Sequence, residues 1–529
     1  MARMQNKEEN SSTNHTIARG AMTVMAAFIA SNLVGLLAKT LTARYFGTTI
    51  ESSAFFAANR FSEILFSLVA GGALGSAFIP VFTGLLVNNE QKKAWKLASS
   101  IINIVTLVLV LLSILTIIFS KSIVRFVLAP GFNSVEISLT SRLLRIQVLS
   151  SIIFGLSGLA MAILNSHQRF FLPAIAPAMY QVGWIFGIVV LSPGMGIDGL
   201  AWGVVIGAGM HLLVQIPQLL KLDDQTLSFG LGLWMDEVKE VARLMAPRLL
   251  GVAIVQLNFL LNTFLASFQQ EGAITAISLA FPLMIMPEAA IAQSIAIAAL
   301  PTFSALVAKR NMQEMQQTLA STLRAVILLA IPASVGLVVL RTPIVQLLYG
   351  SNAFDASSVD LVAWALLWYA IGLLGHGLVE ITSRAFYSLH DTRTPVIIGV
   401  GAMITNLGLS VFFTALFSRI NWMPHGGLAL ANSMATGIES IILLVLMNKK
   451  LKGIAAQNIF NAVWKAILAS AVMVGVILFI DLTILQQSLP ARTAFSIILG
   501  TLSYFFVLVI LKTAEISKAA ALIWNKLFK

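Results

Sequence analysis

The stretch LASSIINIVTLVLVLLSILTIIF, residues 97–119, contains no charged side chain. A run of roughly 20 apolar residues is long enough to cross the hydrocarbon core of a bilayer as one helix. Residues 97–119 therefore predict a transmembrane helix.

Runs of the same kind recur along almost the whole chain. Hydrophobic residues make up 58% of the sequence, charged residues 11%, and the mean hydropathy is +0.89. A water-soluble domain of 529 residues would not show this balance. The sequence predicts an all-α polytopic membrane protein with about fourteen transmembrane helices. The expected spans are 21–43, 62–86, 97–119, 143–165, 170–192, 198–220, 242–267, 274–305, 321–341, 359–383, 395–417, 426–447, 462–484 and 493–512.

The loops and motifs argue against an enzyme. No loop is long enough to fold as a soluble catalytic domain of about 100 residues. Cysteine is absent, and so are GxGxxG, Walker A and HExxH patterns, so we expect no catalytic residue, cofactor or metal site. Asp223, Asp224 and Asp391 are the acidic candidates in loops, and we expect Asp391 to organise the turn before Pro395.

Basic residues predict the orientation. With the N-terminus in the cytoplasm, short cytoplasmic loops carry about twice as many Lys and Arg residues as the loops on the other side. The first 20 residues do not read as a cleavable signal peptide, so both termini are expected to be cytoplasmic. The net charge of +12 is explained by this bias and by attraction to anionic membrane lipids, and we expect no nucleic-acid partner.

Two regions of the chain echo each other. LAPGF (128–132) precedes the fourth span, which ends in AILNSHQRFFLPAIAP (162–177); LLYGSNAF (347–354) precedes the tenth, which ends in AFYSLHDTRTPVIIG (385–399). The spacing is roughly 220 residues, or about six spans, which predicts two six-helix lobes related by a pseudo-two-fold axis. The alternative is turn chemistry shared between unrelated loops.

The repeat divides the chain into lobes, loops and tails. The expected parts are a cytoplasmic N-terminal tail (1–20), an N-terminal six-helix lobe (21–221), a cytoplasmic inter-lobe loop (222–241), a C-terminal six-helix lobe (242–448), two additional transmembrane helices (449–512) and a cytoplasmic tail (513–529).

These motifs, with PRLLGVAIVQLNFLLNTFLASF (247–268) and AALPTFSALVA (298–308), resemble the MurJ (MviN) family of lipid II flippases. That family belongs to the MOP superfamily together with MATE exporters. The resemblance implies a bacterial inner-membrane protein that moves a polyprenyl-diphosphate-linked peptidoglycan precursor to the outer leaflet by alternating access. It also implies a role in cell-wall biogenesis and cell shape, with the precursor, membrane lipids and other cell-wall synthesis proteins as partners.

A diphosphate headgroup needs cationic groups in a hydrated cavity. Members of the family typically place arginines there; the matching positions in this chain are Asn32, Ala38, Phe66 and Pro282. Lys39, next to Ala38, can supply one positive charge, and Arg60, expected at the start of the second span, matches a basic position of the family. The alternative for Lys39 is snorkelling to the membrane interface.

Other polar residues inside spans are further substrate-site candidates. Arg248 follows Pro247 and could instead reach lipid headgroups, whereas Glu288 lies in the middle of the eighth span. Glu380 and Arg384 share a helix face with His376 and could simply neutralise one another. Gln256, Asn258 and Asn262 are expected to hydrogen-bond neighbouring helices.

Glycine and proline mark the expected gates. Gly71, Gly72 and Gly75 form a small-residue patch in the second span, and Pro282 and Pro287 interrupt the eighth. Paired interruptions in two repeats point to a transport site. The alternative is the ordinary enrichment of Gly and Pro in membrane helices.

Four functions remain open from sequence. The favoured one is a lipid II flippase; the others are a flippase for another lipid-linked glycan, a MATE-like small-molecule exporter and a non-transporting cell-wall scaffold. An exporter of cations should have a carboxylate-rich cavity in the first lobe, where Glu63 is the only well-placed acid. A scaffold should have no solvated cavity.

Overall fold

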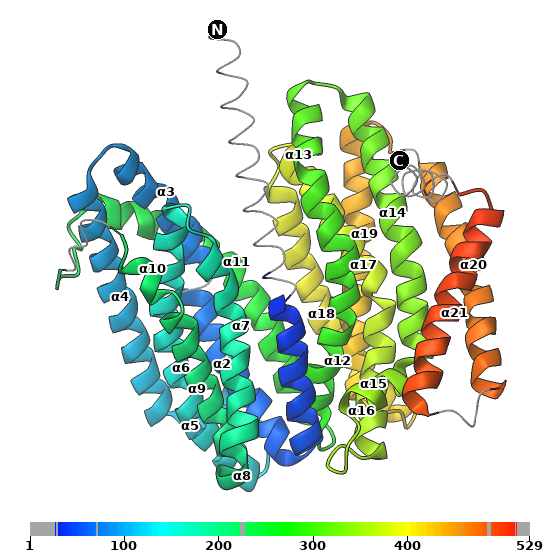
Figure 1. Cartoon of the computed structure of the whole chain (residues 1–529), viewed down its shortest axis with the longest axis horizontal. Coiled ribbons are helices and arrows are strands. Elements are labelled where there is room, and N and C mark those ends of the chain that lie inside the picture. Colours follow the sequence, from blue (N-terminus) through cyan, green and yellow to red (C-terminus); the bar gives the residue numbers. More distant parts are fainter. Residues whose placement is uncertain are drawn as a thin grey trace. The chain divides into compact units, whose positions relative to one another are not determined.

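The computed structural model describes residues 27, 30–69, 72–222, 228–454, 456–483, 488–513 and 515. Within these residues every regular element is helical (Figure 1). Eleven of the described helices are long and apolar enough to cross a membrane, or up to twelve if the bent pair Ala356–Ile371 and Leu373–Ser388 forms one span. The all-helical polytopic fold is confirmed, and the count of about fourteen spans stays a prediction.

The chain divides into two compact units, Met1–Ile274 and Thr275–Lys529. The boundaries of the six-helix lobes expected from the repeat stay a prediction. After a helix over 30–46, unit 1 contains α2 (Ile50–Val69), α3 (Gly72–Val87), α4 (Gln91–Ile118), α5 (Ser120–Ile123), η1 (Val124–Leu128), α6 (Ser134–Ser166), α7 (Phe171–Phe186), η2 (Gly187–Leu191), α8 (Ser192–Met195), α9 (Ile197–Leu213), α10 (Ile216–Leu219) and α11 (Asp236–Ala266).

Unit 2 continues the helical pattern. Its elements are α12 (Ala273–Glu288, which begins at the boundary), η3 (Ala289–Gln293), α13 (Ser294–Ala308), α14 (Met312–Val339), α15 (Arg341–Tyr349), α16 (Ala356–Ile371), α17 (Leu373–Ser388), α18 (Arg393–Arg419), α19 (His425–Leu451), α20 (Ala456–Thr483) and α21 (Leu489–Ile510).

The second expected span is wrong at its start. Helix α2 begins at Ile50 instead of residue 62, and Arg60 therefore lies inside the helix, not at the start of a span. Hydropathy hid this helix because Glu51, Arg60 and Glu63 lower its average. The structure tolerates two of these charges inside unit 1 because Arg60 and Glu63 pair with each other.

Helices α7 and α9 lie side by side with their backbones in close approach (Figure 1). A Cβ atom added to Gly183 would lie 2.2 Å from Cα of Gly207, and one added to Gly187 would lie 2.5 Å from Cα of Gly203. Glycines four residues apart occupy one face of a helix, and the absence of side chains there lets two helices touch along their backbones. The sequence signal, GLAWGVVIG over 199–207, is a double GxxxG pattern that the span count did not use.

The prolines of the eighth span do not break it. Pro282 and Pro287 lie inside α12, and residues 273–308 form one apolar span through α12, η3 and α13. A π-helical turn, η3, follows directly after Pro287 and Glu288. Such turns shift the hydrogen-bond register of a helix without ending it and are common at functional sites. The expected interruption is thus a change of helix type.

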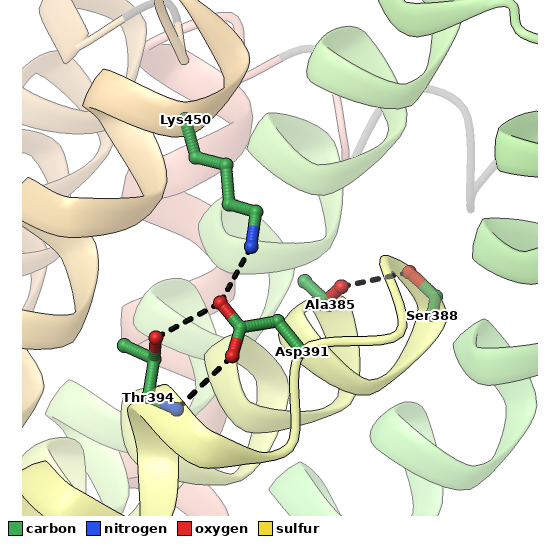
Figure 2. A network of polar contacts seen from close by, with 5 residues as sticks. All are labelled: Ala385, Ser388, Asp391, Thr394 and Lys450. Carbon is green, nitrogen blue, oxygen red and sulfur yellow. Dashed lines mark hydrogen bonds and ion pairs between the residues drawn. The ribbon is translucent and has the colours of Figure 1, made fainter.

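Asp391 organises the loop between α17 and α18, as expected from sequence (Figure 2). Its Oδ1 accepts a hydrogen bond from the backbone N–H of Thr394 at 3.0 Å, and its Oδ2 accepts from Thr394 Oγ1 at 2.8 Å and from Lys450 Nζ at the end of α19. The bond from Lys450, followed by those from Thr394, lowers the pKa of Asp391 to about 2. This carboxylate therefore joins α17, α18 and α19 as a structural group.

Candidate functional site

Unit 1 contains an open cavity of about 580 Å³, which we call the unit-1 cavity. Its walls come from α2, α3, α6, α7, α9 and α11, and apolar atoms form most of their surface. Small-molecule sites are commonly cavities of about 300–1,000 Å³ with apolar walls and a few polar groups. Its polar lining residues include Asn59, Arg60, Ser62, Glu63, Gln181, His211 and Gln256.

Helix α2 carries a compact charged group into the unit-1 cavity. Arg60 Nη1 donates to Glu63 Oε2 at 2.7 Å, and Asn59 Nδ2 donates to Glu63 Oε1 at 2.8 Å. The spacings of three and four residues place the three side chains on one face of the helix. The Arg60 guanidinium also lies 4.9 Å from the ring centre of Phe259 in α11. Each carboxylate oxygen of Glu63 thus accepts a hydrogen bond, and the negative charge of Glu63 balances the positive charge of Arg60.

Lys39 lies near this pair without joining it. Its ammonium group is close enough to Glu63 and Arg60 for both charges to act on it. Among the described residues no ion pair within 4 Å is found for Lys39, and its side chain is half-buried in the helix over 30–46. Among the described residues no carboxylate forms an ion pair with Lys39, whereas the charges of Arg60 and Glu63 balance each other.

His211 was missed by the sequence analysis. It is buried in α9 and lines the unit-1 cavity, and its Nδ1 is 2.6 Å from Ser157 Oγ in α6. Gln215 Nε2 donates to the same hydroxyl at 2.8 Å. A single histidine in an apolar run gives no sequence signal that shows whether its side chain faces a cavity or a neighbouring helix. Gln256 also lines the cavity, and its expected hydrogen bond to a neighbouring helix stays a prediction.

Asn32 and Arg248 do not join this group. Both side chains are exposed, and neither belongs to the described wall of the unit-1 cavity. Arg248 lies well inside α11 (Asp236–Ala266), so its reach to lipid headgroups stays an expectation. The structure therefore brings together Lys39 and Arg60 from the expected set in unit 1.

The other expected site residues gather in unit 2. Arg384 Nη2 donates to Glu380 Oε1 at 2.7 Å, which is the neutralising pair that the spacing suggested. Glu288 is 4% exposed, accepts a hydrogen bond from Gln293 Nε2 at 3.2 Å and is close enough to Glu380 for their charges to interact. Among the described residues no group of three or more His, Cys, Asp or Glu side chains could hold a metal ion.

The glycines expected at the gate differ in position. Gly71 lies outside the described residues, and Gly72 is the first residue of α3. Gly75 lines the unit-1 cavity, and a Cβ atom added there meets no described atom within 4 Å. Gly75 thus faces cavity space in this structure and makes no close helix contact.

The profile of the family "Lipid II flippase MurJ" matches residues 42–499. The chain belongs to the MurJ family. The lipid II flippase MurJ of Burkholderia cenocepacia is 31% identical over 440 residues, which cover 82% of this chain and 84% of that protein. The probable lipid II flippase MurJ of Vibrio cholerae is 29% identical over 479 residues, or 87% and 88% of the two chains.

Solved structures agree with this membership. A lipid II flippase MurJ in an inward closed conformation is 25% identical, with a TM-score of 0.79, over 96% of this chain and all of that one. An inward-facing multidrug resistance MATE family transporter of the MOP superfamily is 15% identical, with a TM-score of 0.67, over 80% and 94% of the chains. The second likeness shows the shared fold of MurJ and MATE proteins.

Proposed function

We infer that this protein is a lipid II flippase of the bacterial cytoplasmic membrane, with both termini in the cytoplasm. The observation that carries the inference is the MurJ family match over residues 42–499, supported by 31% identity to a lipid II flippase over most of both chains. The protein is a transporter and not an enzyme. Its substrate is the polyprenyl-diphosphate-linked peptidoglycan precursor, and its product is the same molecule in the outer leaflet.

Lys39 is our candidate for binding the diphosphate. Phosphate needs a charge-assisted donor, and a cation already paired with a carboxylate offers less to an incoming anion. Arg60 is paired with Glu63, whereas no ion pair is found for Lys39 among the described residues. Lys39 can therefore replace the arginines that the family places elsewhere in its cavity.

The unit-1 cavity argues against the two most distant alternatives. Glu63 is the single carboxylate among its described lining residues, and Arg60 neutralises it, so the cavity lacks the acidic surplus that a cation exporter needs. A cavity of about 580 Å³ with polar groups in its wall also differs from the closed interior expected of a scaffold.

Expression in a cell depleted of its own lipid II flippase tests the proposal. We expect this chain to restore growth, because the precursor would again reach the outer leaflet. Growth and osmotic lysis are the measurements, with an empty vector as control. Continued lysis, with insertion of the protein in the membrane verified, contradicts lipid II as the substrate and favours another lipid-linked glycan.

We propose that transport uses alternating access, with residues 71–76 and the α12–η3 segment as moving parts. Gly72→Leu is expected to trap one state without loss of expression, because bulk in a small-residue patch prevents close helix approach. The chain has no cysteine, so single cysteines replacing Ser76 or Ser304 can be labelled from each side of the membrane without background. Identical labelling of both positions from both sides, with and without Gly72→Leu, contradicts gating.

A further inference from the structure

The residues that lead into α11 form an exposed apolar segment outside the helices. Residues 228–235 read SFGLGLWM and contain no charged side chain. Phe229 is 105% exposed and Trp234 is 91% exposed, and Leu233 is exposed as well. A single exposed apolar side chain is ordinary, whereas several in one short segment mark a surface that contacts a partner or lipid. We call residues 228–235 the apolar loop.

Two polar side chains of α4 hold the backbone of the apolar loop. Ser99 Oγ accepts a hydrogen bond from the backbone N–H of Ser228 at 3.1 Å. Asn103 Nδ2 donates to the backbone oxygens of Ser228 and Gly230, each at 3.0 Å. In a loop surrounded by water, water molecules could satisfy these backbone groups. Here an otherwise apolar helix supplies the partners.

Gly232 brings the apolar loop into close contact with the same helix. Its φ is 55°, which lies in the left-handed region that favours glycine. A Cβ atom added to Gly232 would lie 2.3 Å from Ser100 Oγ, and this hydroxyl donates to Met235 Sδ at 3.8 Å. The loop is therefore packed against α4 and does not project away from it.

The apolar loop continues the lipid-facing side of α4. Residues four apart share one face of a helix, and Asn103, Leu107 and Leu111 have this spacing. Leu107 is 46% exposed and Leu111 is 52% exposed, and α4 is long and apolar enough to cross a membrane. Exposed leucines on a membrane-spanning helix face acyl chains. The loop that Asn103 holds lies at the beginning of that same face.

The position of Asn103 along α4 gives the depth of the apolar loop. Lys96 is exposed and is the last charged residue before the charge-free run at 97–119. With a rise of 1.5 Å per residue, Asn103 lies about 10 Å beyond Lys96, inside a hydrocarbon core about 30 Å thick. Irregular backbone at membrane depth is tolerated where protein groups satisfy it. Ser99 and Asn103 do this for the loop.

We propose that the apolar loop is a membrane anchor, with Phe229 and Trp234 inserted into the leaflet next to the start of α4. The occupant of this surface is lipid, because the loop continues the lipid-facing side of α4. Lys92 and Lys96, both exposed, lie at the matching level for phosphate headgroups. Aromatic side chains, tryptophan above all, suit the membrane interface. The inference requires a membrane-spanning chain and does not depend on which substrate is transported.

Spin labels on single introduced cysteines test the anchor in the full chain in lipid nanodiscs. Phe229→Cys and Trp234→Cys are compared with Leu111→Cys on the lipid-facing side of α4 and with Asn88→Cys in the exposed turn before α4. Oxygen is enriched among acyl chains, whereas a nickel chelate stays in water. We expect the ratio of oxygen to nickel collisions at 229 and 234 to be about tenfold above that at Asn88→Cys, because both labels would lie in lipid.

The collision pattern distinguishes the possible surroundings of the apolar loop. Frequent nickel collisions at both positions, as at Asn88→Cys, place the loop in water and overturn the proposal. Few collisions with either reagent show that another protein surface covers the loop, and this result overturns the proposal as well. Frequent oxygen collisions with few nickel collisions, as at Leu111→Cys, support it.

Two glycines of the apolar loop give a matched pair of variants. Gly232→Val places a β-branched residue at a positive φ and against Ser100, so the loop should leave α4 and lose its hydrogen bonds from Asn103. Nickel collisions of a label at Trp234→Cys should then rise about threefold or more, because the released backbone must be hydrated. A Cβ atom added to Gly230 meets no described atom within 4 Å, so Gly230→Val should leave the collisions unchanged.

The variants test the contact with α4 as the support of the anchor. Equal nickel collisions in Gly232→Val and Gly230→Val contradict this support. The melting temperature of each variant verifies that it is folded. If Gly232→Val does not fold, the labels at Phe229→Cys and Trp234→Cys in the otherwise unchanged chain decide alone.

Discussion

Lys39→Ala is expected to abolish transport of lipid II. The diphosphate needs a cationic partner inside the membrane, and Lys39 is the basic residue of the first helix that no described carboxylate pairs. Removal of its ammonium group leaves Arg60, whose guanidinium is bound to Glu63 at 2.7 Å. The measurement is growth of flippase-depleted cells together with the appearance of lipid II in the outer leaflet.

Conservative and distant substitutions control this test. Lys39→Arg should retain part of the activity, because it keeps the charge but changes its reach and geometry. Lys92→Ala removes an exposed lysine at the start of α4 and should leave transport unchanged. Normal flipping by Lys39→Ala would show that Lys39 only reaches the membrane interface.

The fold could be predicted well because hydropathy reports it directly. Residues 97–118 of the run at 97–119, for example, lie in α4, which begins earlier, at Gln91. The start of α2 was lost because its charges satisfy one another inside unit 1, and an average over a window does not see pairing. The start of a helix that carries charges therefore depends on which side chains pair in the folded chain, and the sequence alone does not show these pairs.

The candidate site was predictable only in part. Lys39 and Arg60 stand out as basic residues in or beside apolar runs, which is a sequence signal. No such signal marks His211, Ser157 and Gln215, because their hydrogen bonds form only when α6 packs against α9. Glu63 could be named as an acid, but its ion pair with Arg60 and its hydrogen bond from Asn59 depend on the folded helix.

Gly203→Leu is expected to prevent folding of unit 1. A Cβ atom at this position would lie 2.7 Å from Cα of Gly187 and 3.0 Å from the backbone oxygen of Gly183. These neighbours are backbone atoms, so no side chain can rotate away and α9 would have to separate from α7 and η2. Overpacking usually costs about 1–3 kcal/mol, and a clash with backbone along a helix pair should reach the upper end or exceed it. Loss of the monomeric species in detergent and a lower melting temperature would report the effect.

Gly209→Leu on the same helix is the matched control. A Cβ atom added to Gly209 meets no described atom within 4 Å, so leucine there has space and should improve helix propensity. The two variants make the same chemical change in α9 and differ in what the new side chain meets. Loss of folding in both would point to a general intolerance of α9 to bulk, whereas loss in Gly203→Leu alone assigns the effect to the backbone contact with α7 and η2.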